Sequence, residues 1–397
     1  MTSVDRPGER DPSFGLIARR AGAAALRRLT GRRRPGRAAN LAADALRSRF
    51  AALAEATPGA VRELHFFDLP ADRPPWFDTG LRLEEGEAVS WFATGRVELS
   101  RLLDIFVGPD FQLWGRVGEG PIFRGTRAHH TFRTESAGRL DLASYFPAEW
   151  TDPQGGIDVP PESYAELGGG MTVAVVRWKG DPGAALAEWA TRDDPAGLIS
   201  GECARLAAPP QSPEGWNYLW FLGPGEIFEA GTEDGKACMH CHTRGDAAIL
   251  QKEVSAALAP GTRLAWEWKV DALPSSMRED SLPTHDYLSI AVEFENGLDL
   301  TYTWSPELPV GHAYWCPLPS WKDRELHVVL RSGPDGLGAW QSEERDLHAD
   351  AERYFGAAPG RVVRVWFIAV SLFQRSEGRC TWRDVRLDGE AGLQSIL

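Results

Sequence analysis

The stretch Leu288-Ser-Ile-Ala-Val-Glu-Phe-Glu-Asn-Gly-Leu-Asp-Leu-Thr-Tyr-Thr-Trp304 decides the fold class. Large apolar side chains take every second position on both sides of Asn296-Gly297, a dipeptide that favours a tight turn between two strands. Successive side chains of a strand point to opposite faces of a sheet, so this alternation gives each strand one apolar face. The stretch therefore predicts an antiparallel hairpin that lies against a sandwich core.

The same two-residue period extends over most of the chain from residue 61 onward. Residues 264–270 alternate in the same way, and residues 362–373 are almost continuously apolar, as expected for a strand buried on both faces. Short strand-like runs separated by turn residues fill 61–178, which is typical of a sandwich or jelly roll. Residues 14–31, 38–56 and 183–207 have helical spacing instead.

With 397 residues the chain is long enough for two domains and an extension. We predict a mostly β protein with two β-sandwich (jelly-roll-like) domains, a helical N-terminal arm and a helical linker. The predicted boundaries are 1–60 for a basic helical arm, 61–180 for the first β-sandwich, 181–213 for the helical linker, 214–390 for the second β-sandwich and 391–397 for a tail.

The formal net charge is −13, yet residues 1–60 are rich in arginine. The remaining body is therefore strongly acidic, which excludes nucleic acid as its partner, because phosphate binding needs a basic face. The basic arm is interpreted either as a mobile, solvated tail or as a segment that touches an anionic membrane surface or nucleic acid.

The cysteines are odd in number and widely spaced, which predicts no disulfide framework. They are Cys203, Cys238, Cys241, Cys316 and Cys380. The sequence also has no apolar run of about 18 residues, so no membrane-spanning helix is predicted. We therefore expect reduced thiols and a cytoplasmic location, with the basic arm as the one segment suited to membrane association.

Four segments of the second predicted sandwich resemble a bacterial family catalogued as domain of unknown function 3047. They are Trp266–Pro274, His285–Phe294, Leu300–Ser305 and Arg345–Gly356, and the resemblance covers about residues 214–390. It implies a jelly-roll-like sandwich and no particular reaction. A pair of aspartates that the family usually has after its last buried strand is replaced here by Ser371-Leu-Phe-Gln-Arg375.

Residues 76–178 resemble the sandwich of bacterial galactophilic lectins. The resemblance is carried by Asp78-Thr-Gly80, Gly138-Arg-Leu140 and the strand-like run Met171–Val176. It implies a lectin-like fold for 61–180. The loop before the last strand lacks the asparagine-rich string that binds calcium in those lectins, so the resemblance does not extend to calcium or galactose.

The motif Cys238-Met-His240-Cys241-His242 is open to three interpretations. Its CxxCH pattern is that of c-type haem attachment, which also requires an exported chain. Cysteine and histidine are preferred zinc ligands, so two of these residues could bind zinc with help from His129, His130 or His285. The third interpretation is a turn with buried thiols and hydrogen-bonded imidazoles.

His129 and His130 stand next to each other at the start of a predicted strand. Adjacent strand residues point to opposite faces, so only one of them can face a pocket. The alternative is that one of them is packed and the other solvated, and a metal role would need partners from distant parts of the sequence.

His285-Asp286 directly precedes the strand that begins the fold-deciding stretch. Histidine next to aspartate suits proton transfer, so Asp286 and His285 are candidate catalytic residues; a turn that caps the strand is the alternative. The loop that follows Trp304 is rich in aromatic residues and would lie at one rim of the sandwich. Its candidate ligand-binding residues are Trp304, His312, Tyr314, Trp315 and Trp321, with loop packing as the alternative.

These residues lead to three functional hypotheses. The first is an enzyme of the lyase, cyclase or hydrolase type that applies acid–base chemistry to a bulky apolar, isoprenoid-like or glycoside-like small molecule in an aromatic-lined pocket. The second is a non-catalytic carbohydrate- or ligand-binding protein. The third is a zinc-, other metal- or haem-binding redox protein that uses Cys238, His240, Cys241 and His242.

Overall fold

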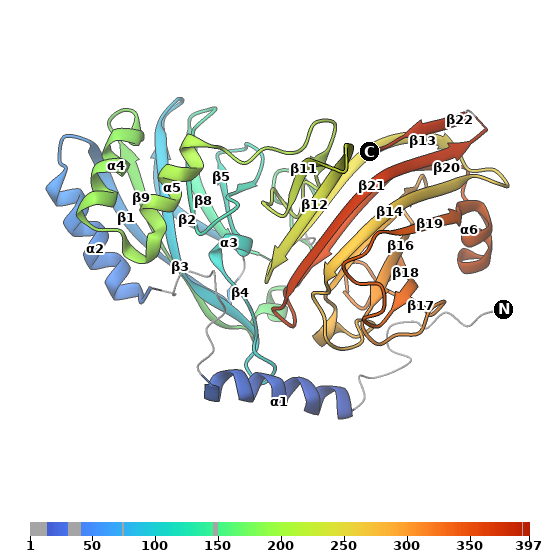
Figure 1. Cartoon of the computed structure of the whole chain (residues 1–397). Coiled ribbons are helices and arrows are strands. Elements are labelled where there is room, and N and C mark those ends of the chain that lie inside the picture. Colours follow the sequence, from blue (N-terminus) through green and yellow to red (C-terminus); the bar gives the residue numbers. More distant parts are fainter. Residues whose placement is uncertain (1–13, 31–40, 74, 146–149, 391) are drawn as a thin grey trace. The chain divides into compact units, whose positions relative to one another are not determined.

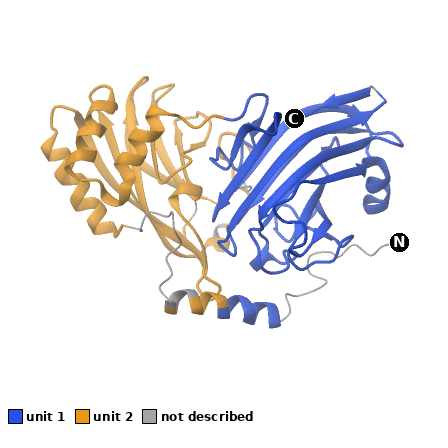
Figure 2. Cartoon of the chain, viewed as in Figure 1, with its two compact units in different colours: residues 1–22, 212–397 blue, residues 23–211 orange. Residues whose placement is uncertain are grey.

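The computed structural model describes residues 14–30, 41–73, 75–145, 150–390 and 392–397, and most of their regular structure is β-strand (Figure 1). Contacts within the chain define unit 1, residues 1–22 and 212–397, and unit 2, residues 23–211 (Figure 2). In each unit the described strands form two β-sheets. The predicted mostly β, sandwich-type fold is confirmed.

The first sheet of unit 1 has seven strands among the described residues. Their order is β10 (Asn217–Tyr218), β13 (Ala247–Ala257), β20 (Arg361–Val370), β15 (Tyr287–Phe294), β16 (Asp299–Ser305), β18 (Glu325–Ser332) and β17 (Ala313–Trp315). All neighbours are antiparallel except β16 and β18, which are parallel. The predicted hairpin is formed by β15 and β16, with Ser289 opposite Thr303 and Gly297 at a φ of 79° in the turn.

The second sheet of unit 1 closes the sandwich. Its order is β11 (Phe228–Glu233), β12 (Lys236–Arg244), β21 (Glu377–Gly389), β14 (Arg263–Ala272) and β19 (Gln341–Asp346), with β22 (Gly392–Ser395) paired to β21. Aromatic side chains from both sheets meet in the core: the ring centroids of Trp266 and Tyr302 are 5.6 Å apart. Helix α6 (Leu347–Phe355) contributes its buried side to the same core.

Unit 2 also has two sheets. One has the order β1 (Val61–Pro70), β9 (Gly168–Trp178), β3 (Ala88–Ser100) and β4 (Ile105–Val107), with β7 (His129–Arg133) paired to β3. The other has the order β2 (Trp76–Leu83), β8 (Gly138–Ser144), β5 (Leu113–Val117) and β6 (Phe123–Arg124), and the short helix α3 (Pro109–Gln112) precedes β5. Apolar side chains of the two sheets form one core.

Three helices form a third layer in unit 2, and they come from the segments for which the sequence predicts a helical arm and a helical linker. They are α2 (Ala43–Ala56), α4 (Pro182–Arg192) and α5 (Leu198–Ala207). Their buried side chains pack on the face of β3 and β9 that points away from the sandwich core; the rings of Phe50 and Phe92 are 4.8 Å apart. Because β3 and β9 also carry large apolar side chains, such as Phe92 and Trp178, on this second face, it too has to be covered. The helices at 43–56 and 182–207 are thus parts of one folded unit.

Helix α1 (Phe14–Thr30) begins within unit 1. The buried guanidinium of Arg20 donates hydrogen bonds to the carbonyl oxygens of Pro283, at 3.2 Å, and of Phe373. Arg19 pairs with Glu307 at 2.7 Å. Residues 1–13 and 31–40 of the predicted arm lie outside the described residues. None of the helices in the described part of the chain combines the length and the apolar character that a bilayer crossing requires.

Candidate functional sites

A cavity of about 260 Å³ lies at one end of the sandwich of unit 2. It is lined by the end of β5, the turn that follows it, β6, β7 and the residues after β7. The lining residues are Val117, Gly120, Pro121, Phe123, His130, Phe132, Arg133, Thr134, Glu135 and Ser136. Strand β7 pairs with β3, so His130 and Phe132 stand opposite Trp91 and Val89, two residues of the sandwich core.

Aromatic rings form one side of this cavity. The ring centroids of Phe123 and Phe132 are 4.8 Å apart, and the buried ring of Trp91 stacks on Phe123 at 5.5 Å with an interplanar angle of 13°. Gly115 makes this stack possible, because a Cβ at that position would lie 3.0 Å from both Trp91 and Phe123. Phe123 and Phe132, held from behind by the buried Trp91, present a rigid apolar surface to a ligand.

His130 adds the polar group closest to these rings. Its ring centroid lies 5.2 Å from that of Trp91, and its Nδ1 has no hydrogen-bond partner in the described part of the chain. Burial, together with the positive charge of Arg205, lowers the pKa of His130 to about 4. The imidazole is therefore neutral near pH 7 and has both a donor and an acceptor nitrogen.

His129 points to the opposite face of β7, as the strand alternation predicts. Its Nδ1 lies 2.6 Å from a carboxylate oxygen of Glu202 on α5, and Arg205 holds the same carboxylate. Burial raises the pKa of Glu202, but the hydrogen bonds from Arg205 and His129 outweigh it and lower the value to about 2. His129 thus joins α5 to the sheet.

A second hollow, of about 570 Å³, lies between β7 and the helices α4 and α5. Phe132 and Arg133 line both hollows. Arg133, Glu135 and Ser136 are exposed and form a polar rim around the first cavity. Unit 2 therefore offers an aromatic surface with hydrogen-bonding groups at its edge.

In unit 1 the predicted catalytic pair His285 and Asp286 is fully buried, and the two side chains make different contacts. The Nδ1 of His285 faces the carbonyl oxygen of Glu279 at 2.6 Å. Burial and the nearby His327 ring lower the pKa of His285 to about 3. The carboxylate of Asp286 accepts backbone hydrogen bonds from Phe373, at 2.8 Å, and from Gln374. Its two backbone bonds favour the alternative of a structural turn, while its catalytic role stays a prediction.

The predicted aromatic wall is divided between the two faces of the first sheet. The ring of Trp304 lies in the sandwich core, 5.8 Å from Trp268, and Trp315 packs against Phe355 of α6. On the other face Tyr314 stacks on His327 at 4.8 Å and on His312 at 5.7 Å, and Trp321 contacts Trp366 at 6.1 Å. Tyr314 and Trp315 are adjacent in β17, so they cannot face the same ligand.

The motif at Cys238 is a strand and not a loop. Residues 236–244 form β12, so Cys238 and Cys241 point to opposite faces. Cys241 is buried in the sandwich core, whereas the Sγ of Cys238 lies 3.4 Å from the Nε2 of His240. His242 pairs with Glu377 at 2.9 Å. The structure thus contradicts a common haem or zinc site for the two cysteines, since a strand cannot bring both thiols to one ligand.

His327 and Glu325 were not among the residues that the sequence indicated. They lie on one face of β18, and Glu325 accepts hydrogen bonds from the hydroxyls of Tyr287, at 3.0 Å, and Thr301, at 3.2 Å. Burial raises the pKa of Glu325, but the nearby imidazoles of His327 and His285 outweigh it and lower the value to about 2. The alternation of Glu325 and His327 with apolar Leu326 and Val328 was a usable signal, because polar residues at every second position of a buried strand share one face.

Comparisons with known proteins find the family that the second predicted sandwich resembles. Among solved structures, the chain is similar to the N-terminal domain of EclA, a PllA-like lectin, with 16% identity over 28% of this chain and 94% of that one, at a TM-score of 0.22. It is also similar to the xyloglucanase domain of NopAA, a type three effector from Sinorhizobium fredii, with 9% identity over 47% of this chain and 96% of that one, at a TM-score of 0.28. No curated protein sequence matches the chain. Residues 214–386, most of unit 1, match the model of the family described as "Protein of unknown function (DUF3047)".

Proposed function

We propose that unit 2 is a binding module for an uncharged, single-ring polar ligand of the sugar class. The observation that carries this proposal is the cavity of about 260 Å³, in which the rings of Phe123 and Phe132 lie next to the imidazole of His130. Binding sites of this kind combine an apolar surface with a few polar groups that fix the orientation of the ligand.

The size and chemistry of the cavity select the ligand class. Pockets for drug-sized molecules measure about 300–1,000 Å³, so a cavity of about 260 Å³ suits a single ring. A pyranose presents C–H groups from one face and hydroxyl groups around its edge. The first would lie on the aromatic surface, and the second would reach His130 and the rim residues Glu135 and Ser136.

The neutral state of His130 supports an uncharged ligand. With its pKa lowered to about 4, the imidazole carries no positive charge for a phosphate or carboxylate near pH 7. The rim also holds one basic and one acidic side chain, Arg133 and Glu135, whose charges offset each other. An anion would therefore find little net attraction here, whereas hydroxyl groups find donors and acceptors.

A glycan array with the full chain, followed by calorimetry with the best monosaccharide, tests the proposal. We expect binding in the micromolar to millimolar range, weakened at least tenfold by His130→Ala and by Phe132→Ala. The matched control is His65→Ala in the same unit, because His65 is half exposed on β1 and lies outside the cavity lining. Circular dichroism shows whether each variant is folded. An array without any binding, or binding unchanged in both cavity variants, would rule the proposal out.

A further inference from the structure

One face of the first sheet in unit 1 is polar and yet buried. On β15, β16 and β18 this face carries Tyr287, Ser289, Thr301, Thr303, Glu325 and His327, and each of these side chains is at most 3% exposed. Buried polar groups cost free energy unless they find partners, so a buried polar layer needs an explanation. Three side chains of this layer and its surroundings provide one.

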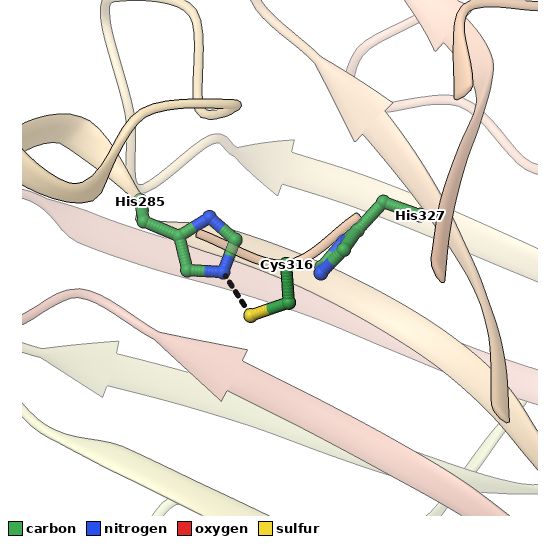
Figure 3. Close-up of side chains that lie close together, drawn as sticks. All are labelled: His285, Cys316 and His327. Carbon is green, nitrogen blue, oxygen red and sulfur yellow. Dashed lines mark hydrogen bonds between the residues drawn. The ribbon is translucent and has the colours of Figure 1, made fainter. Parts of the chain in front are cut away.

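His285, Cys316 and His327 come together from three separate segments (Figure 3). His285 follows the 3₁₀ turn Leu282–Thr284, Cys316 follows β17, and His327 belongs to β18. One nitrogen of each histidine and the Sγ of Cys316 all lie within 4.8 Å of one another, and all three side chains are fully buried. The Nε2 of His285 is 3.3 Å from that Sγ.

The contact of His285 with Glu279 fixes which of its nitrogens is available. The carbonyl oxygen of Glu279 can only accept a hydrogen bond, so the Nδ1 at 2.6 Å from it carries the hydrogen. In the neutral ring the Nε2 then has the lone pair, and this lone pair faces Cys316. Histidines that bind metals are commonly oriented in this way, with the second nitrogen donating to a backbone carbonyl or a carboxylate.

His327 is the second, independent observation. Its ring is fully buried between Tyr314, stacked at 4.8 Å, and Tyr287, at 4.7 Å. Neither of its nitrogens makes a hydrogen bond within the described residues, although the Nε2 lies 3.3 Å from a carboxylate oxygen of Glu325. A buried imidazole that is held in place without hydrogen bonds, next to a thiol and a second imidazole, is suited to a ligand that accepts its lone pair.

We propose that His285, Cys316 and His327 bind one zinc-type divalent cation in unit 1. Nitrogen and thiolate sulfur are the ligands that zinc prefers, whereas magnesium and calcium require oxygen. In tetrahedral zinc sites the Zn–N and Zn–S bonds measure about 2.0–2.1 and 2.3 Å, which separates the two ligand atoms by roughly 3.5 Å. The distance of 3.3 Å between His285 and Cys316 is close to this value, and a small contraction brings His327 into the same sphere.

Glu325, which lies beside the cluster of His285, Cys316 and His327, would become the fourth ligand when the cation draws these groups together. Its carboxylate lies beside His327 and is already oriented by the hydroxyls of Tyr287 and Thr301. Binding replaces the thiol hydrogen of Cys316 by the cation, and the released proton leaves to the solvent. The thiolate and the carboxylate together balance the two charges of the ion. Four protein ligands in a fully buried place make a closed site, which stabilises the fold by joining the segments around residues 285, 316 and 327.

The metal content of the untagged full chain tests this inference. We expect one zinc per chain, removable by a chelator, and on titration of the stripped protein with cobalt(II) the absorption of a tetrahedral cobalt–thiolate centre. Cys316→Ser should abolish the thiolate-to-cobalt band, and His327→Gln should weaken cobalt binding at least tenfold. In the wild type, bound zinc should protect Cys316 from alkylation, which mass spectrometry measures at that residue.

Cys238→Ser is the matched control, because this cysteine is equally buried, belongs to the same unit and lies outside the proposed site. It should keep the metal and the cobalt spectrum. A chain that neither carries zinc nor takes up cobalt would overturn the inference, and so would a cobalt band that is lost in Cys238→Ser but kept in Cys316→Ser. The alkylation measurement needs no variant, so it remains decisive if a substitution prevents folding. Because the site lies in unit 1, its failure leaves the sugar-class ligand of unit 2 untouched.

Discussion

In unit 2, the face of β3 and β9 that points away from the sandwich core is mostly apolar and is covered by α2, α4 and α5, and its buried hydroxyls at Ser90, Thr94 and Thr172 all have hydrogen-bond partners. The comparable face of β15, β16 and β18 in unit 1 carries serine, threonine, glutamate and histidine. Both faces are buried, but apolar burial stabilises a fold, whereas polar burial costs free energy for each group without a partner. The first arrangement stabilises the fold directly, whereas the second needs a partner for each buried polar group.

Buried polar atoms without hydrogen-bond partners show where this free-energy cost arises in unit 1. Ser289 Oγ, Thr303 Oγ1, one oxygen of Asp299 and both nitrogens of His327 lack hydrogen-bond partners within the described residues. Burial and the adjacent charge of Glu325 raise the pKa of Asp299 well above its ordinary value. Burying this polar layer costs more free energy than burying the helix-covered face of unit 2. A bound ion that partners some of its groups would offset part of this cost.

The helix cover of unit 2 gives the largest expected effect. Phe50 of α2 contacts Phe92 of β3 at 4.8 Å and Trp189 of α4 at 5.9 Å, so Phe50→Ala removes a ring from the centre of the layer. We expect a loss of about 3–5 kcal/mol in the free energy of unfolding of unit 2. Hydrogen–deuterium exchange with mass spectrometry measures it unit by unit. The control is Glu55→Ala on the exposed side of α2, and equal exchange in both variants would show that α2 is a loosely attached arm.

The pH dependence of stability tests how α5 is held in unit 2. The carboxylate of Glu202 on α5 has a pKa lowered to about 2 from an ordinary value of 4.5. Between these values the unfolded chain binds a proton that the folded one does not, so stability is complete above about pH 4.5 and falls as the pH falls towards 2. Glu202→Gln should flatten this dependence by about 3 kcal/mol across the window, measured by chemical denaturation. Parallel curves for the two proteins would mean that α5 is not held by this charge.

The fold-deciding stretch shows what local sequence can predict. The hairpin of β15 and β16 follows from alternation and from Asn296-Gly297, and both signals lie within 17 consecutive residues. Local sequence could not predict in the same way against which sheet α2 packs. Its buried face at Leu46, Phe50 and Leu53 has helical spacing, but that spacing does not tell which sheet the helix covers. Long-range packing of this kind is decided by the second apolar face of β3 and β9.

The candidate sites follow the same rule. The sequence indicated His285, next to Asp286, and the aromatic loop that ends at Cys316, yet nothing local joins these two segments. They meet His327 only because β18 returns parallel to β16 after a crossover of about 20 residues and places Glu325 beside Asp299. The strand alternation did separate His129 from His130 correctly, but a parallel crossover leaves no comparable mark in the sequence.

A substitution of Asp286, in unit 1, is expected to cause the smallest loss of stability among these predictions. The carboxylate of Asp286 accepts backbone hydrogen bonds from Phe373 and Gln374, so it ties the segment after β20 to the start of β15. Asp286→Asn keeps the shape but replaces one acceptor by a donor, and we expect a loss of about 2 kcal/mol, seen as faster amide exchange at residues 371–375. Asp271→Asn, at an exposed position of β14, is the control and should leave this exchange unchanged. If Asp286→Asn also left the exchange unchanged, the carboxylate would not be needed for structure, and the acid–base role that the sequence indicates for it would become the better explanation of its burial.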